Sequence, residues 1–131
     1  MADDTQGKQI QLAQAPFYGD IVDGTVAHDG TVYVSPKRIC ESIGLAWTTQ
    51  FRKLGNARWS RMIMMIIRDS EGRSQQTAMI PLKAVPMWLA GINPSKVKPE
   101  LRDKLERYQD EVVEVLSAWF LGISDTPGLA K

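Results

Sequence analysis

The stretch that most constrains the fold is residues 40–54, which predicts a short helix, a turn and a second short helix. Gly44 marks the turn, because glycine readily adopts the left-handed conformation that ends many helices. Ser35 and Pro36 are typical of a helix start, since a serine side chain caps free amides and proline suits the first helical position. In the second helix, apolar residues at the spacing of one helical stripe predict a buried face formed by Trp47, Phe51 and Leu54.

Two β-hairpins are predicted on either side of this helical pair. Between Phe17 and Val34, β-branched residues flank His28-Asp29-Gly30, which has the chemistry of a tight turn. Further on, Trp59–Ile67 and Gln75–Ile80 flank a second polar turn. The arm Trp59–Ile67 is apolar on both faces, so we expect it at the centre of a sheet or beneath a helix.

The last third of the chain predicts two further helices. A short one over Leu82–Ile92 tolerates Pro86 only in its first turn. A long one is expected from Pro99 to Gly122, with an apolar seam at heptad spacing. This seam either pairs with a second chain or covers the chain's own sheet, and its members are Leu101, Leu105, Tyr108, Val112, Val115 and Trp119.

Together these elements predict an α+β fold. Two hairpins form an antiparallel β-sheet, and short helices and one long C-terminal helix pack on it. The length of 131 residues suits one domain, expected over residues 15–122. Residues 1–14 are expected to form a flexible N-terminal arm, and residues 123–131 a C-terminal tail.

Basic residues are concentrated in the middle of the chain. Residues 35–68 hold seven basic residues and one acidic residue, whereas both ends of the chain are net acidic. Such a segment suits nucleic-acid phosphates or an acidic protein surface, and a solvated face is the simpler alternative. The residues predicted to contact a repressor protein or DNA are Thr49, Gln50, Arg52, Lys53, Arg58 and Arg61.

A helix–turn–helix that reads DNA is a weaker interpretation of the same stretch. Cys40 and Gly44 have the right spacing for its small residue and its turn glycine. However, Gln50 occupies a position where that motif has an apolar core residue. A plain helix pair packed on a sheet is the alternative. The four tryptophans, which fit inward-facing patterns, are expected mainly in the core: Trp47, Trp59, Trp88 and Trp119.

The residue inventory argues against an enzyme. The single histidine, His28, lies in a predicted turn, and the single cysteine, Cys40, lies on the apolar face of a helix. No glycine-rich phosphate loop or cluster of metal ligands is apparent, so no cofactor, metal or small-molecule substrate is expected. No apolar run has the length of a membrane span, so we expect no membrane partner and a soluble, cytoplasmic protein.

Several ordered blocks of the sequence resemble the N-terminal domain of phage P22-type antirepressors, which is similar to the BRO family N-terminal domain. The resemblance covers roughly residues 17–120. Its blocks are Tyr33-Val34-Ser35, Ile39-Cys40-Glu41, Gly44-Leu45-x-Trp47-x-x-Gln50-x-x-Lys53-Leu54, Ile80-Pro81-Leu82, Trp88-Leu89, Val97-Lys98-Pro99-Glu100-Leu101-Arg102 and Leu105-x-x-Tyr108-Gln109.

The resemblance implies a bacteriophage or prophage regulator acting in the cytoplasm of the bacterial host. Such an antirepressor binds the repressor that maintains lysogeny, prevents it from binding its operators and so promotes lytic gene expression. The alternative implied by the BRO domain is a DNA-binding transcriptional regulator. The family also implies a homo-oligomer, for which the apolar seam of the last helix is the predicted contact.

Overall fold

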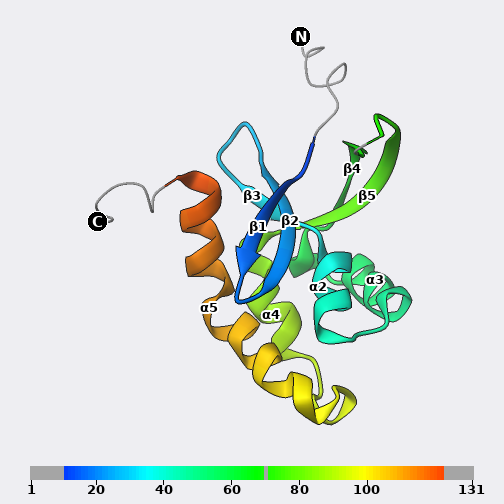
Figure 1. The fold of residues 1–131 in the computed structure, drawn as a ribbon. Coiled ribbons are helices and arrows are strands. Elements are labelled where there is room, and N and C mark those ends of the chain that lie inside the picture. Colours follow the sequence, from blue (N-terminus) through cyan, green and yellow to red (C-terminus); the bar gives the residue numbers. More distant parts are fainter. Residues whose placement is uncertain (1–10, 70, 123–131) are drawn as a thin grey trace.

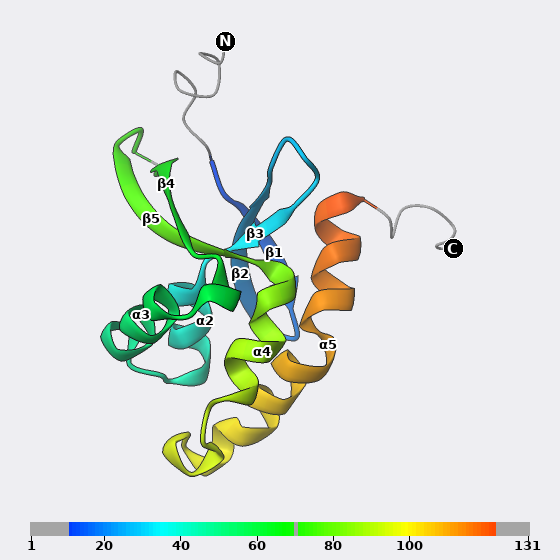
Figure 2. The same cartoon turned by 180° about the vertical axis from the view of Figure 1, so that it is seen from behind.

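The structure is a computed structural model that describes residues 11–69 and 71–122. It confirms the α+β class: a five-stranded antiparallel sheet of order β1-β2-β3-β5-β4 carries the helices (Figures 1 and 2). The strands are β1 (Ala13–Phe17), β2 (Asp20–Val26), β3 (Val32–Val34), β4 (Ile63–Arg68) and β5 (Ser74–Pro81). The helices are α2 (Pro36–Ile43), α3 (Trp47–Asn56), α4 (Val85–Ala90) and α5 (Arg102–Leu121). Single 3₁₀ turns are η1 (Arg58–Ser60), η2 (Leu82–Ala84), η3 (Pro94–Lys96) and η4 (Pro99–Leu101).

The first predicted hairpin is in fact a three-stranded meander. The turn at residues 28–30 is present between β2 and β3, and Gly30 has a φ of +88°. An additional strand, β1, pairs with β2 from Ala13 opposite Gly24 to Phe17 opposite Asp20. The sequence places Ala13 and Gln14 in the N-terminal arm, but the structure places them in β1. The sequence does not indicate this strand, because β1 lacks β-branched residues. Residues 1–10 of the predicted arm and the whole predicted tail lie outside the described residues.

Helix α2 begins and ends where the sequence predicts. The Ser35 side chain accepts a hydrogen bond from the backbone amide of Arg38 at 3.3 Å. At the other end, Gly44 takes the left-handed conformation with a φ of +83°, and its amide donates to the Cys40 carbonyl. Cys40 itself is fully buried, and desolvation raises the pKa of its thiol to about 12. The interpretation of this cysteine as a small core residue is therefore confirmed.

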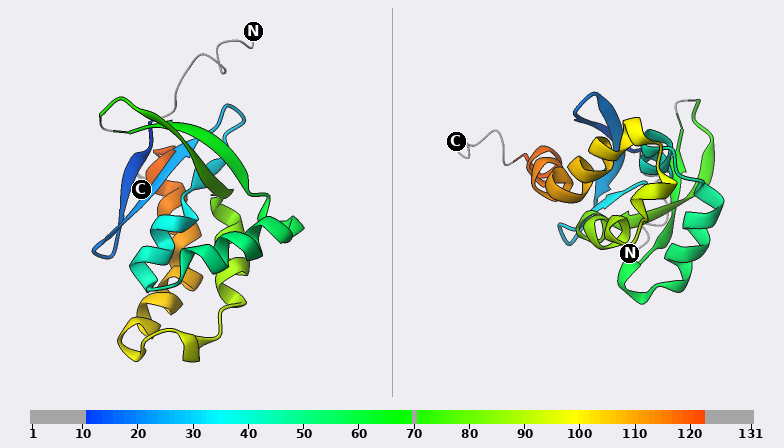
Figure 3. Two further views of the ribbon diagram at one scale, coloured as in Figure 1. Left: turned by 90° about the vertical axis from the view of Figure 1, so that its right-hand side faces the viewer. Right: turned by 90° about the horizontal axis from the view of Figure 1, so that it is seen from below.

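The second hairpin differs from the prediction in its position. The end of β5 joins β3, where Val34 pairs with Ile80, while the rest of β5 extends beyond the sheet with β4 as its partner. The β4–β5 hairpin therefore arches away from the helices (Figure 3). Since β4 is an edge strand and four of its six residues are exposed, the expectation that this apolar arm is central or covered by a helix is wrong. Its start is also later than predicted, because η1 and an Arg61 residue with a φ of +49° interrupt the arm before Ile63.

Helix α5 lies beside α4 and covers the β1–β2 side of the sheet (Figure 2). Leu105, Tyr108 and Val112 are buried in the core that α5 shares with the rest of its own chain. The Tyr108 hydroxyl also donates to Asp20 at 3.3 Å. The centre of the predicted seam thus packs on the chain's own core, which is one of the two alternatives that the sequence left open, and self-association through the remaining seam residues stays a prediction. Of the other seam residues, Leu101 and Val115 are partly buried and Trp119 is 40% exposed.

Candidate functional site

The predicted contact residues lie between the start of α3 and the end of β4. We call residues 47–68 the α3–β4 segment. On α3, Leu54 faces the core, whereas Thr49, Arg52 and Lys53 are exposed on the outer side. After α3 the chain turns through η1, where the Ser60 hydroxyl donates to the Leu54 carbonyl at 2.6 Å. This buried hydroxyl fixes the turn and leaves Arg58 and Arg61 exposed.

Gln50 is an exception among the predicted contact residues. Its side chain is 6% exposed, and its Oε1 accepts a hydrogen bond from the indole Nε1 of Trp88 at 2.8 Å. The predicted exposure of Gln50 is therefore wrong: the residue fastens α3 to α4. The burial of Gln50 could have been predicted from the helix–turn–helix motif, because that motif has a core side chain at the position of Gln50. A buried glutamine meets that requirement when a buried donor stands opposite it.

The exposed cations of the α3–β4 segment form no ion pair with a carboxylate of the described residues. These cations are Arg52, Lys53, Arg58, Arg61 and Arg68. Elsewhere, Lys104 pairs with Asp20 at 3.2 Å and Arg73 pairs with Glu71 at 3.0 Å. The segment holds no acidic residue, so its positive charge is not neutralised locally.

Exposed apolar side chains gather in the same segment. Eleven large hydrophobic residues are exposed within the described ranges, and five of them belong to it. Their exposed fractions are 41% for Phe51, 40% for Trp59, 40% for Ile63, 49% for Met64 and 45% for Ile66. The predicted burial of Phe51 on α3 is wrong, because its ring lines a groove, and the expected burial of the β4 side chains fails because the hairpin that carries β4 leaves the body of the domain. Such a concentration of apolar surface beside polar groups is typical of a macromolecular interface.

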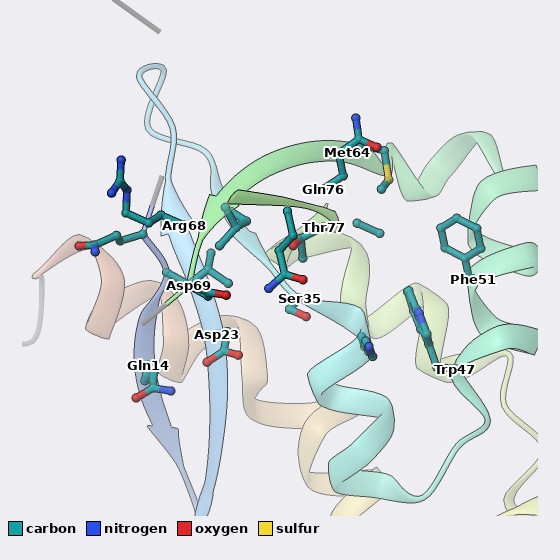
Figure 4. A pocket seen from close by; sticks show the side chains of 16 residues that line it. Gln14, Asp23, Ser35, Trp47, Phe51, Met64, Arg68, Asp69, Gln76 and Thr77 are labelled. Atoms are coloured by element: carbon teal, nitrogen blue, oxygen red, sulfur yellow. The ribbon is translucent and has the colours of Figure 1, made fainter. Parts of the chain in front are cut away.

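A groove of about 780 Å³ lies between α3 and the β4–β5 hairpin (Figure 4). On one side stand the rings of Trp47 and Phe51, whose centroids are 5.5 Å apart. On the other sides are Met64 from β4 and Asp23 from β2. The groove thus joins an aromatic wall to a polar floor, which suits an elongated ligand with mixed side chains.

Asp23 is the unusual polar group of this groove. One carboxylate oxygen, Oδ1, is buried and has no hydrogen-bond partner among residues 11–69 and 71–122. Desolvation raises the pKa of this carboxyl group, and the positive charge of Arg38 and a side-chain hydrogen bond with Gln14 only partly oppose the shift. Sequence reasoning gives no sign of this, because Asp23 is one of several acids in an acidic N-terminal region.

The four tryptophans divide between core and surface. Trp88 is 3% exposed and Trp47 packs against the core, as predicted. Trp59 and Trp119 are each 40% exposed, so the core prediction is wrong for these two. Trp59 therefore joins the α3–β4 segment as an exposed aromatic residue, which is a residue type enriched at interfaces.

No helix over residues 11–69 and 71–122 is both long and apolar enough to cross a membrane. Within the same ranges, no three histidine, cysteine or acidic side chains are grouped so that they would hold a metal ion.

Comparison with known protein families gives a match. A family model described as the P22_AR N-terminal domain matches residues 13–124. This range takes in the whole sheet and every helix described above. Neither curated proteins nor solved structures gave a match.

Proposed function

The chain belongs to the P22_AR N-terminal domain family, the N-terminal domain of P22-type antirepressors, and on this basis we propose that it binds a phage repressor. The family is a regulatory domain and is not known as an enzyme. In the proposal, binding keeps the repressor from its operators and allows lytic genes to be expressed in the bacterial host. The bound chain acts by steric occlusion, and no covalent step is involved.

The observation that carries this proposal is the composition of the α3–β4 segment. It combines exposed aromatic and aliphatic side chains with cations that lack a partner among the described residues. Protein interfaces favour this combination, since buried aromatic anchors supply affinity and arginines form bidentate contacts with carboxylates. We expect Phe51, Trp59 and Met64 to supply the apolar contact, and Arg52, Lys53 and Arg58 to orient an acidic partner.

DNA binding by the same segment is the second candidate. It is favoured by the exposure of Thr49, Arg52 and Lys53 on the outer side of α3, as on a recognition helix. The exposed apolar side chains argue against it, because protein–DNA interfaces are more polar than protein–protein interfaces. We therefore favour a protein partner.

The proposal is tested first by function. Expressed in bacteria that carry prophages, the chain should induce lytic growth in at least one lysogen. The repressor of the responding prophage is then purified and bound to its operator DNA. Added chain should release the operator in a mobility-shift assay, whereas operator DNA without repressor should not shift. If the chain shifts operator DNA without repressor, at the concentration that releases the repressor, the DNA-binding alternative is favoured instead.

A charge-reversal variant tests which surface is used. The variant replaces Arg52, Lys53 and Arg58 by glutamate and should bind the repressor at least about tenfold more weakly. A matched control reverses three exposed lysines outside the segment, Lys83, Lys96 and Lys98. If both variants bind as tightly as the unchanged protein, the assignment of the α3–β4 segment is wrong, even where the antirepressor function stands.

A further inference from the structure

We propose that the free edge of β4 receives an extended segment of the partner as a sixth strand of the sheet. The segment has apolar residues at its centre and acidic residues at its ends. This inference rests on the proposed function, because it specifies how the repressor is recognised. It goes beyond that function by naming backbone pairing as the main contact.

The first observation is that the backbone of β4 has hydrogen-bonding groups with which no strand of the described residues pairs. No strand within the described ranges lies on the far side of β4. At the hairpin end, the amide of Asp69 donates to the carbonyl of Arg73 at 2.8 Å, so this pair faces inward. Hydrogen-bonding direction alternates along an antiparallel strand. The amides of Met65 and Ile67 therefore point to β5, and those of Met64 and Ile66 point outward.

The second observation is that residues 63–67 of β4 lack the features that usually protect an edge strand. Proteins block such edges with proline, with charges or with a covering element. The opposite edge, β1, contains Pro16 and is contacted by α5. In contrast, residues 63–67 of β4 are Ile-Met-Met-Ile-Ile, with no proline and no charge. An unprotected apolar edge in a folded domain is a template for strand addition.

The surroundings of β4 supply pockets for the side chains of an added strand. Side chains alternate between the two faces of a sheet, and Ile63 and Met64 are exposed on opposite faces. The groove beside Met64 also presents the Phe51 ring (Figure 4). An added strand with apolar residues would therefore cover apolar surface on both faces of the hairpin.

Charge decides between a partner segment and a second copy of this chain. Arg61 precedes β4 and Arg68 ends it, and no acidic residue lies between them. A second copy paired through β4 would bring another set of like charges against the first, which is unfavourable at an interface. A segment with acidic ends would instead pair with these arginines. The structure thus favours an acidic-ended strand from a different protein.

The test separates backbone pairing from side-chain contact at one position. Met64→Pro removes an outward amide, and Met64→Thr changes the side chain but keeps that amide. Edge strands tolerate proline where no ladder hydrogen bond is lost. Binding is measured for both variants against the purified repressor from the responding lysogen. A second probe is a fluorescent peptide of about ten residues that alternates valine and threonine between aspartate ends.

We expect Met64→Pro to bind both probes at least about tenfold more weakly than Met64→Thr. The peptide with aspartate ends should also bind at least about tenfold more tightly than the same peptide with lysine ends. Circular dichroism and urea unfolding check the fold, and Ile66→Pro with Ile66→Thr replaces the first pair if Met64→Pro unfolds.

Equal binding by the proline and threonine variants would overturn strand addition. If the unchanged protein still binds the repressor in that case, only this inference fails. If the unchanged protein binds no repressor, the proposed function fails as well.

Discussion

At the scale of single residues, Gln50 determines which side chains of α3 remain available to a partner. Its hydrogen bond with Trp88 turns one polar side chain of α3 inward. The neighbouring Thr49, Arg52 and Lys53 then form the outer side of the helix. The spacing of apolar residues identifies Leu54 as buried, but it cannot identify Gln50, because only the opposing indole makes its burial favourable.

Replacing Gln50 tests this role. Gln50→Ala leaves the buried Trp88 indole N–H without an acceptor, so we expect a loss of about 1–3 kcal/mol in the free energy of unfolding. Thr49→Ala, on the exposed side of the same helix, should change it by less than about 0.5 kcal/mol. Urea denaturation followed by tryptophan fluorescence measures both. Equal losses of unfolding free energy in the two variants would mean that the hydrogen bond between Gln50 and Trp88 does not stabilise the fold.

Asp23 makes stability depend on pH in a defined direction. Because desolvation raises its pKa in the folded state, folding favours the protonated carboxyl group. This contribution to stability is complete below the pKa of the unfolded chain, about 4, and is lost as pH rises through the folded-state pKa. Asp23→Asn should therefore be more stable than the unchanged protein at pH 7, and the difference should shrink towards pH 3.

Asp29 provides a control of opposite sign. The Thr31 backbone amide donates to its carboxylate and lowers its pKa. Its stabilising contribution is present above the unfolded pKa and lost as pH falls, so Asp29→Asn should be less stable at pH 7. Unfolding curves at several pH values check both signs. The same sign for both variants would contradict the assignment of the Asp23 environment.

At the scale of elements, local signals predict α2 well and predict the position of β4 poorly. The limits of α2 follow from Ser35 and Gly44, which act on backbone groups within a few residues of themselves. The strand character of β4 is also evident from its composition. Its place at the sheet edge is not, because that depends on β5 pairing with β3 through only its last residues. A continuous apolar run suits a buried strand and an interface strand equally well.

Adjacent lysine substitutions test the edge position. Ile66→Lys places a charge at a side chain that is 45% exposed, so its effect on the free energy of unfolding should stay within about 0.5 kcal/mol. Ile67→Lys places the same charge at a side chain that is 5% exposed, and a loss of about 2–4 kcal/mol is expected. Urea unfolding measures both. A central β4 would make the two substitutions similarly damaging.

At the scale of the whole molecule, the core and the candidate site occupy separate parts of the fold. Helix α5 closes the core on the β1–β2 side, whereas the α3–β4 segment lies toward the other edge of the sheet (Figures 1 and 2). The fold class and the basic character of the segment follow from the sequence. The exposure of Ile63, Met64 and Ile66 does not, because it results from the long-range placement of the β4–β5 hairpin.

Salt dependence distinguishes the two candidate partners. If the five cations of the α3–β4 segment all contact DNA phosphates, raising the salt from about 50 to 200 mM should weaken binding roughly 500-fold. A protein partner held also by apolar contacts should lose less than about tenfold over that range. Isothermal titration with the repressor, beside fluorescence anisotropy with operator DNA, measures both. A steep loss with the repressor would contradict an interface with an apolar core.

The burial of Cys40, the chain's single cysteine, allows a dye to be attached at one chosen position of the folded protein. A sulfhydryl with a pKa of about 12 is almost entirely unreactive toward maleimide at neutral pH while the protein stays folded. A cysteine introduced at Arg61 would then be the one site that takes a dye. Partner docking at the α3–β4 segment becomes visible through that dye, and any slow labelling of Cys40 reports the transient opening of the core.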